Sequence, residues 1–304
     1  MTLRLVHLRT TLARANAIPE LASSFSRIHQ LRQLETIKLT FVPFSTGLGS
    51  ASKGPALQAS ILGALSESFS IHTPFKLKAL SLQNLRPLDL TPLETPPCQT
   101  VLKNLRHLRL SVLYEHAEDI ITRLDRWVHF WGTLCHRLVL APTQHRLTEL
   151  SLESNIFVGA SSRLSFADLH FPYLCALSLR RIVFEPSVGA ESFILRHGAT
   201  LSRLELIKCG LIIDTISNST HWEQIWDNFL VGLTTLVALH VHESRGTSWG
   251  NRYVRRGAPV TAYWAMFVPK QLDVADDAAF QRFYVTVAAR SEKQNTSSRT
   301  ERGA

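Results

Sequence analysis

The sequence predicts an α/β fold with parallel strands on the inside and helices on the outside. The string LxxLxL, or a close copy of it, recurs seven times, and stretches with helical spacing of apolar residues lie between the copies. Leucine is also unevenly distributed, because 45 of the 46 leucines lie in residues 1–239. Strands that alternate with helices in this way form a parallel sheet covered by helices.

The seven copies carry an apolar residue at their first, fourth and sixth positions. They begin at Leu34, Leu77, Leu105, Leu147, Leu174, Leu201 and Leu236. Side chains two apart on a strand share a face, so the last two apolar residues point into the core together and the first fills the space beneath them. Two copies continue to Asn155 and Cys209, where the chain leaves the strand and the side chain can satisfy buried backbone groups.

This pattern predicts an irregular leucine-rich-repeat solenoid over residues 1–243. Successive copies begin 27 to 43 residues apart, whereas such repeats usually have about 20–29 residues, so inserted loops are expected. The helices expected between the copies are, in chain order, 55–69, 115–138, 188–197 and 219–236. Pro55 is expected at the start of the first helix, and Ser219 or Thr220 as the N-cap of the last.

The chain changes character after residue 243, where it becomes aromatic and poor in leucine. Residues 244–290 are expected to form a C-terminal cap, because a terminal repeat would otherwise leave its apolar face in water. Residues 291–304 contain almost no apolar side chain, and a disordered tail is expected there.

Charge and composition exclude several classes of partner. The net charge of +9 divides into +5 before residue 240 and +4 after it, without a dense Lys/Arg block, so nucleic acid is not expected. No apolar stretch approaches the roughly 20 residues of a membrane span, so no membrane is expected either. The widely spaced cysteines (Cys98, Cys135, Cys175, Cys209) favour a reducing compartment. We therefore expect an intracellular protein, cytoplasmic or nuclear.

The first residues leave a second location open. Arg4, Arg9 and Arg14 precede the first acidic residue, as they would in a mitochondrial presequence. In the interpretation that we favour, the apolar residues of this stretch belong to the repeat instead; they are Leu3, Val6 and Leu8.

The sequence contains no recognisable catalytic constellation. Residues 47–54 hold three glycines and a lysine, but they match neither the GxGxxG nor the GxxxxGK template for phosphate binding. His116 and Asp119 stand at the start of an expected helix, where an acid usually stabilises the helix dipole. His240 and His242 share a strand face, but no third ligand is visible nearby. We therefore predict a protein that is not an enzyme and has no metal or other cofactor.

The residues between the leucines of each copy point away from the core and would line the concave face of the solenoid. They mix acids and bases, which suits a protein partner better than a phosphate backbone. The residues predicted to bind a protein partner are His107, Arg109, Glu149, Glu153, Arg180, Arg203, Glu205 and His242.

Three stretches resemble the fungal F-box and leucine-rich-repeat proteins. They are FPYLCALSLRRIVFEPSVGAESFILRHGATLSRLELIKCGL (171–211), HWEQIWDNFLVGLTTLVALHV (221–241) and DDAAFQRFYVTVAAR (276–290). The resemblance implies a leucine-rich-repeat fold and a role as the substrate-recognition part of a ubiquitin-ligase adaptor, with a protein partner on the concave face.

Members of that family also carry an F-box, a helical module that docks on Skp1. Here the repeat spacing begins within the first 40 residues, so the chain resembles the repeat part alone and is not expected to bind Skp1. Two alternatives stay open, a stand-alone scaffold and a truncated remnant without a link to a ligase. An enzyme with an unrecognised site is the interpretation that we favour least.

Overall fold

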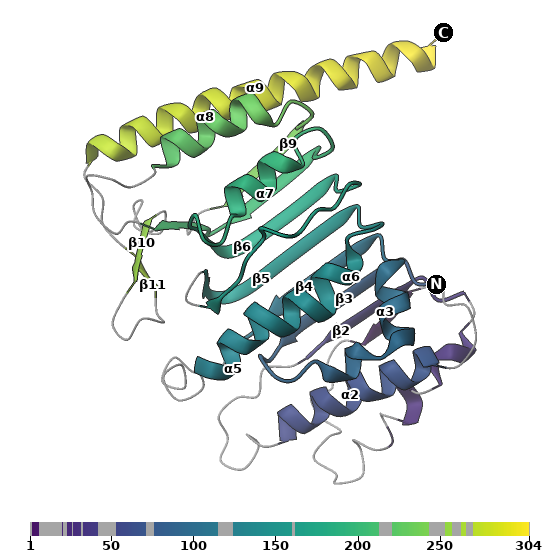
Figure 1. Ribbon diagram of the computed structural model, residues 1–304. Coiled ribbons are helices and arrows are strands. Elements are labelled where there is room, and N and C mark those ends of the chain that lie inside the picture. Colours follow the sequence, from purple (N-terminus) through teal and green to yellow (C-terminus); the bar gives the residue numbers. More distant parts are fainter. Residues whose placement is uncertain are drawn as a thin grey trace. The chain divides into compact units, whose positions relative to one another are not determined.

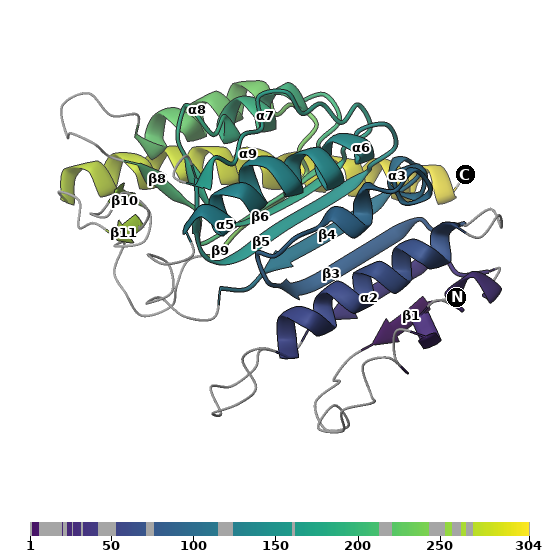
Figure 2. The ribbon, with the colours of Figure 1, turned by 60° about the horizontal axis from the view of Figure 1, so that its bottom comes forward.

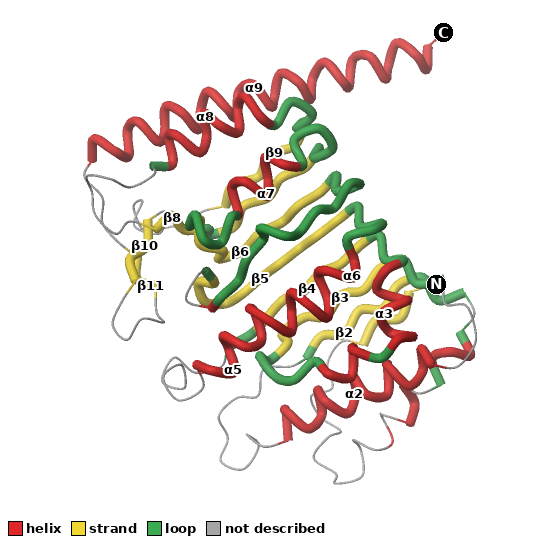
Figure 3. Tube along the Cα trace, in the orientation of Figure 1, coloured by secondary structure: helices red, strands yellow, loops and turns green. Residues whose placement is uncertain are grey.

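The computed structural model confirms an α/β fold, which divides into two compact units (Figure 1). Unit 1 comprises Met1–Ile156, Ser162–Leu164 and Phe171–Tyr173, and unit 2 comprises Phe157–Ser161, Ser165–His170 and Leu174–Ala304. The described residues are 2–5, 20, 23–25, 27–31, 33–41, 53–70, 76–114, 124–159, 162–212, 221–242, 253–256, 263–265 and 270–303. Strands and helices alternate along much of the chain, as Figure 3 shows.

The strands of unit 1 pair in chain order, and every pairing is parallel. They are β1 (Thr2–Leu5), β2 (Thr36–Thr40), β3 (Ala79–Leu85), β4 (His107–Val112) and β5 (Glu149–Val158). Hydrogen-bonding register aligns the LxxLxL copies with one another. Ile37, Leu80, Leu108 and Leu150 are neighbours at one level of the sheet, and the apolar residues two positions later form the next level.

The first leucine of each copy is buried beneath the strands, as the sequence predicts. Leu34, Leu77, Leu105 and Leu147 in unit 1 are at most 2% exposed. Burial of a leucine side chain contributes about 1.5–3 kcal/mol, so each copy adds three such contributions to the core.

A repeated backbone contact fixes the start of each strand. The carbonyl of Lys78 accepts from the N–H groups of Arg106 and His107, and the carbonyl of Arg106 accepts in turn from Thr148 and Glu149. One carbonyl therefore joins each strand to the next at the same point of the repeat.

The first strand uses a different register from the one that the sequence suggests. Leu3 pairs with Ile37, and Leu5 pairs with Leu39, so Leu3 and Leu5 occupy the two levels expected for Val6 and Leu8. Val6 and Leu8 lie outside the described residues.

Helices cover one face of the unit 1 sheet (Figure 2). They are, with short helical turns included, η1 (Ile28–Gln30), α2 (Lys53–Ser70), η2 (Thr91–Glu94), α3 (Pro96–Lys103), α5 (Leu124–His129), the π-helical segment η3 (Phe130–Leu140) and α6 (Ala141–Thr143). The run from α5 to α6 extends past the expected end of the helix 115–138. The start of that expected helix, including His116 and Asp119, lies outside the described residues.

Unit 2 repeats the same parallel arrangement. Its strands are β6 (Ala176–Phe184), β7 (Arg203–Ile207), β8 (Gly210–Ile212), β9 (Ala238–His242), β10 (Tyr253–Arg256) and β11 (Tyr263–Ala265). The strands β6, β7 and β9 are parallel, with Leu177, Leu204 and Leu239 at one level. The end of β6 also pairs with β8, which pairs with β10, and β10 forms an antiparallel pair with β11.

The helices of unit 2 begin and end within the ranges that the sequence predicts, except for the last one. They are α7 (Ala190–Arg196), α8 (Trp222–Gly232) and α9 (Lys270–Gly303). The residue before α8 is His221, so neither Ser219 nor Thr220 is its N-cap, and both lie outside the described residues. The structure also differs from the expected disordered tail, because α9 continues through residues 291–303. No proline or glycine interrupts that stretch before Gly303, so the helical hydrogen bonds can continue.

The helix α9 packs along α8 and satisfies its first turn. Asp276 accepts hydrogen bonds from the N–H of Glu223 (2.8 Å) and from the hydroxyl of Tyr253 (2.5 Å). That hydroxyl accepts in turn from the N–H of Trp222 at 3.3 Å. Asp276 is completely buried. A carboxylate at this position stabilises the positive end of the helix dipole, so residues of the predicted 244–290 cap complete α8.

The side chains of Asn155 and Cys209 satisfy backbone groups of the preceding copy, as the sequence predicts. The chain leaves β7 just before Cys209, but β5 continues through Asn155 to Val158, so the prediction that the chain leaves its strand at Asn155 is wrong. Asn155 donates to the carbonyl of Tyr114 and accepts from its N–H group. In unit 2 the thiol of Cys209 donates to the carbonyl of Leu179 at 3.3 Å. Three copies have a residue in the left-handed region two positions after their last leucine. These residues are Asn84 within β3, Arg181 within β6 and Lys208 directly after β7. No helix of the described residues is long and apolar enough to span a bilayer.

Candidate protein-binding faces of the two sheets

One face of each sheet carries the side chains that alternate with the leucines, and we call it the open face of that unit. On β2 the burial pattern alternates between half-buried and buried residues, and the first residues of β3 and β4 follow the same alternation. All eight predicted partner-binding residues lie on β4, β5, β6, β7 or β9, at positions that alternate with the leucines. His107, Arg109, Glu149 and Glu153 belong to the open face of unit 1, and the other four belong to that of unit 2.

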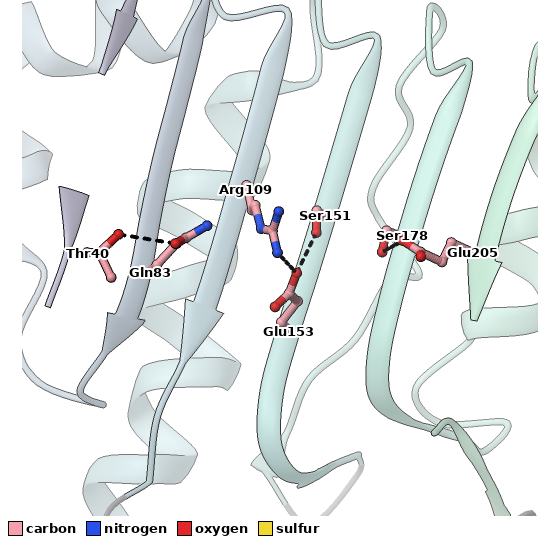
Figure 4. A network of polar contacts seen from close by, with 7 residues as sticks. All are labelled: Thr40, Gln83, Arg109, Ser151, Glu153, Ser178 and Glu205. Carbon is pink, nitrogen blue, oxygen red and sulfur yellow. Dashed lines mark hydrogen bonds and ion pairs between the residues drawn. The ribbon is translucent and has the colours of Figure 1, made fainter. Parts of the chain in front are cut away.

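An ion pair joins β4 and β5 on the open face of unit 1 (Figure 4). A guanidinium nitrogen of Arg109 lies 2.6 Å from Oε1 of Glu153, and the hydroxyl of Ser151 donates to the same oxygen at 3.4 Å. The side chain of Arg109 is 50% exposed, but that of Glu153 is only 12% exposed.

Glu153 is therefore less exposed than the sequence predicts, although it remains a predicted partner-binding residue. The residue is 9% exposed because the guanidinium of Arg109 and the hydroxyl of Ser151 cover its carboxylate. The part of this pair that reaches solvent is mainly Arg109, whose position the buried carboxylate fixes. The contact between Arg109 and Glu153 could have been expected from the sequence, because aligning the copies places these residues diagonally across adjacent strands.

A second charged pair lies at the start of the same strands. Nδ1 of His107 is 3.0 Å from a carboxylate oxygen of Glu149, and the two residues are direct neighbours in the parallel register. Their side chains are 44% and 41% exposed. Both members of this pair therefore reach solvent on the open face.

The β2–β3 side of this face adds uncharged donors and one cation. The hydroxyl of Thr40 donates to the side-chain carbonyl of Gln83 at 3.1 Å (Figure 4). Lys38, Ser81 and Arg109 are neighbours at one level of the sheet. Within the described part of the chain, the buried hydroxyl of Ser81 has no hydrogen-bond partner. At this level of the sheet, the buried hydroxyl of Ser81 therefore lies between one cation on β2 and one on β4.

The open face of unit 2 is built from the same positions but has fewer fixed contacts. The hydroxyl of Ser178 donates to Glu205 at 2.6 Å (Figure 4). His240 is the neighbour of Glu205 on the next strand, and its ring is nearly parallel to that of His242, with 6.0 Å between the ring centres. Arg180 shares a level with Ile207 and His242, and Arg203 lies between Ala176 and Ala238. The sequence predicts the mixture of acid, base and imidazole, and the structure shows where each one lies.

The described residues offer no grouping of three His, Cys, Asp or Glu side chains that could hold a metal ion. Burial raises the pKa of Cys98, Cys135 and Cys209 to about 12, so these thiols are protonated and poor nucleophiles at neutral pH. Residues 47–52 of the glycine-containing loop lie outside the described residues, while Lys53 and Gly54 begin α2.

No model of a known protein family matches the chain. A search of curated proteins also gives no match. The resemblance to F-box and leucine-rich-repeat proteins therefore stays a prediction based on the three quoted stretches.

Proposed function

We propose that the chain is a leucine-rich-repeat protein that binds another protein through its open faces, like the substrate-recognition part of F-box ubiquitin-ligase adaptors. The observation that carries the proposal is the in-register alignment of polar side chains on parallel strands, with helices on the other side of the sheet. Strand residues lose little conformational freedom on binding, so a polar face built on strands is preorganised for a partner.

The contacts within the open face support this proposal. The pairs Arg109–Glu153, His107–Glu149 and Ser178–Glu205 hold charged or polar groups in fixed positions. Fixed charges of both signs select a partner by electrostatic complementarity and suppress partners of the wrong pattern. Mixed charge also distinguishes these faces from a surface that follows a phosphate backbone.

A pair of charge-reversal variants tests the proposal. Lys38→Glu with Arg180→Glu changes one half-buried cation on each open face and leaves the pairs above intact. Arg126→Glu with Lys293→Glu makes the same change in net charge on the helices α5 and α9, where both residues are exposed. Each variant is used as bait in quantitative affinity capture, after thermal denaturation has verified its fold.

We expect proteins captured by the parent chain to be lost with the open-face variant and retained with the helix variant. Retention by the open-face variant would contradict the assignment of these faces. Purified Skp1 separates the two forms of the proposal: an adaptor binds it directly, whereas a stand-alone scaffold does not, and we expect no binding by this chain.

A further inference from the structure

Basic side chains from three separate segments meet where the chain enters β3, β4 and β5 in unit 1. The segments are 76–78, 103–106 and 144–148, and their exposed Lys and Arg residues are Lys76, Lys78, Lys103, Arg106 and Arg146. The segments are adjacent, because the carbonyl of Lys78 accepts from the N–H of Arg106 (2.7 Å) and the carbonyl of Arg106 accepts from the N–H of Thr148 (2.8 Å). We call these five residues the basic edge.

The basic edge has a strong excess of positive charge. None of its three segments contains an acidic residue. Nζ of Lys78 is 2.5 Å from the carboxylate of Glu35 in a pair that is half exposed. The hydrogen bond and charge of Lys78, with a smaller contribution from Lys76, hold the pKa of Glu35 below its usual value. Two acids, Glu35 and Glu149, therefore lie beside five cations, although the sequence shows no dense block of cations.

The repeat does not require these charges. The same positions in unit 2 are occupied by residues 199–202 (ATLS) and 234–237 (TTLV), which are uncharged. Ser202 occupies the position of Lys78 and Arg106, and its hydroxyl donates to the carbonyl of Cys175 at 3.0 Å. In unit 1 the hydroxyl of Thr148 makes the same contact, because it donates to the carbonyl of Arg106 at 3.0 Å. A short side chain is therefore enough at this position, and the exposed cations Lys78 and Arg106 are not needed to complete the repeat. Lys103 has a local role as well, since it lies in the last turn of α3 and interacts favourably with the helix dipole.

We propose that the basic edge binds an acidic, Asp- or Glu-rich segment of a protein partner. Three adjacent strands span about 10 Å, which matches about three or four residues of an extended peptide. The segments of the basic edge contain no Phe, Tyr or Trp, so they lack the large aromatic platforms on which successive nucleic-acid bases stack. This surface is distinct from the open faces and does not depend on their function.

The test measures binding of a fluorescein-labelled oligoglutamate to the full chain by fluorescence anisotropy. The edge variant combines Lys103→Ala, Arg106→Ser and Arg146→Thr, which are the residues that unit 2 carries at the corresponding positions. The matched control combines Arg27→Ala, Arg126→Ala and Lys293→Ala, which removes the same charge from exposed positions elsewhere. Oligoglutamine and single-stranded DNA are measured as comparison ligands.

We expect the edge variant to bind oligoglutamate about tenfold more weakly than the parent chain, because three exposed charge contacts are lost. The control should bind within about twofold of the parent, and parent binding should weaken between about 50 mM and about 200 mM salt. Equal losses in the two variants would overturn the proposal, since net charge alone would then explain binding. No binding to the parent chain would also overturn it, as would edge-dependent binding of DNA that is tighter than that of oligoglutamate.

Discussion

Units 1 and 2 use the same strand motif but connect it to helices in different ways. In unit 1 successive copies begin 28 to 43 residues apart, and the intervening chain forms several short helices beside α2. In unit 2 the first two copies are 27 residues apart and a single helix, α7, connects them. The helices α7 and α8 then approach so closely that glycines are needed at the contact. The leucine levels are common to both units, whereas helix packing and surface charge differ.

The largest predicted effect comes from a substitution that disrupts the close approach of α7 and α8 in unit 2. A Cβ on Gly198 would lie 2.1 Å from the carbonyl oxygen of Gly232, so Gly198→Ala must displace backbone and should destabilise the protein by about 3 kcal/mol. Urea denaturation measures the change. A loss below about 1 kcal/mol would show that α7 and α8 are packed more loosely than described.

The second prediction compares Asn155 with Cys209. Asn155→Ala removes both hydrogen bonds to the backbone of Tyr114, and we expect a loss of about 2 kcal/mol in unfolding free energy. Cys209→Ala removes a weaker sulfur donor, and about 1 kcal/mol is expected. Amide hydrogen exchange at Tyr114 should rise only in the first variant. Equal losses in both variants would contradict the specific role of the asparagine.

A glycine in unit 1 gives the opposite result to Gly198. A Cβ at Gly63, inside α2, would meet no atom within 4 Å. Because glycine disfavours a helix interior, Gly63→Ala should stabilise the protein by about 0.5–1 kcal/mol. Urea denaturation of the Gly63→Ala and Gly198→Ala variants compares their unfolding free energies. A destabilising Gly63→Ala would contradict the open surroundings of Gly63 in α2.

The smallest effect is a pH dependence in unit 2. Burial lowers the pKa of His197, with smaller contributions from His170, whose ring is 5.4 Å away, and from Arg196. As the pH falls, His197 therefore becomes protonated in the unfolded chain before it does in the folded protein. The stability that neutral His197 contributes is thus present above its usual pKa of about 6.5. It is lost as the pH falls from that value through the lower pKa of the folded state. His197→Leu should flatten the dependence of the unfolding free energy on pH between about 7 and 5. An unchanged slope would contradict burial of the neutral ring.

Much of the strand arrangement could be predicted from the sequence, because alternation and the first leucine fix both the face and the level of each strand. The register of β1 could not, since Leu3 with Leu5 and Val6 with Leu8 satisfy the same alternation. The cover over Glu153 depends on a contact across two strands, and a single copy of the repeat does not reveal it. The basic edge depends on three segments that only the fold brings together. Likewise, the polar residues after 290 lack an apolar pattern, so their helix could not be inferred from periodicity.

The central claim is that partners bind the open faces. Site-specific photocrosslinking tests this claim most directly. A photoreactive amino acid replaces Ser111 on β4, Ala238 on β9 or Val231 on α8, where Val231 is 78% exposed. We predict that partners crosslink to Ser111 or Ala238 and not to Val231. Crosslinking confined to Val231 would show that the helical side binds the partner and would contradict the claim.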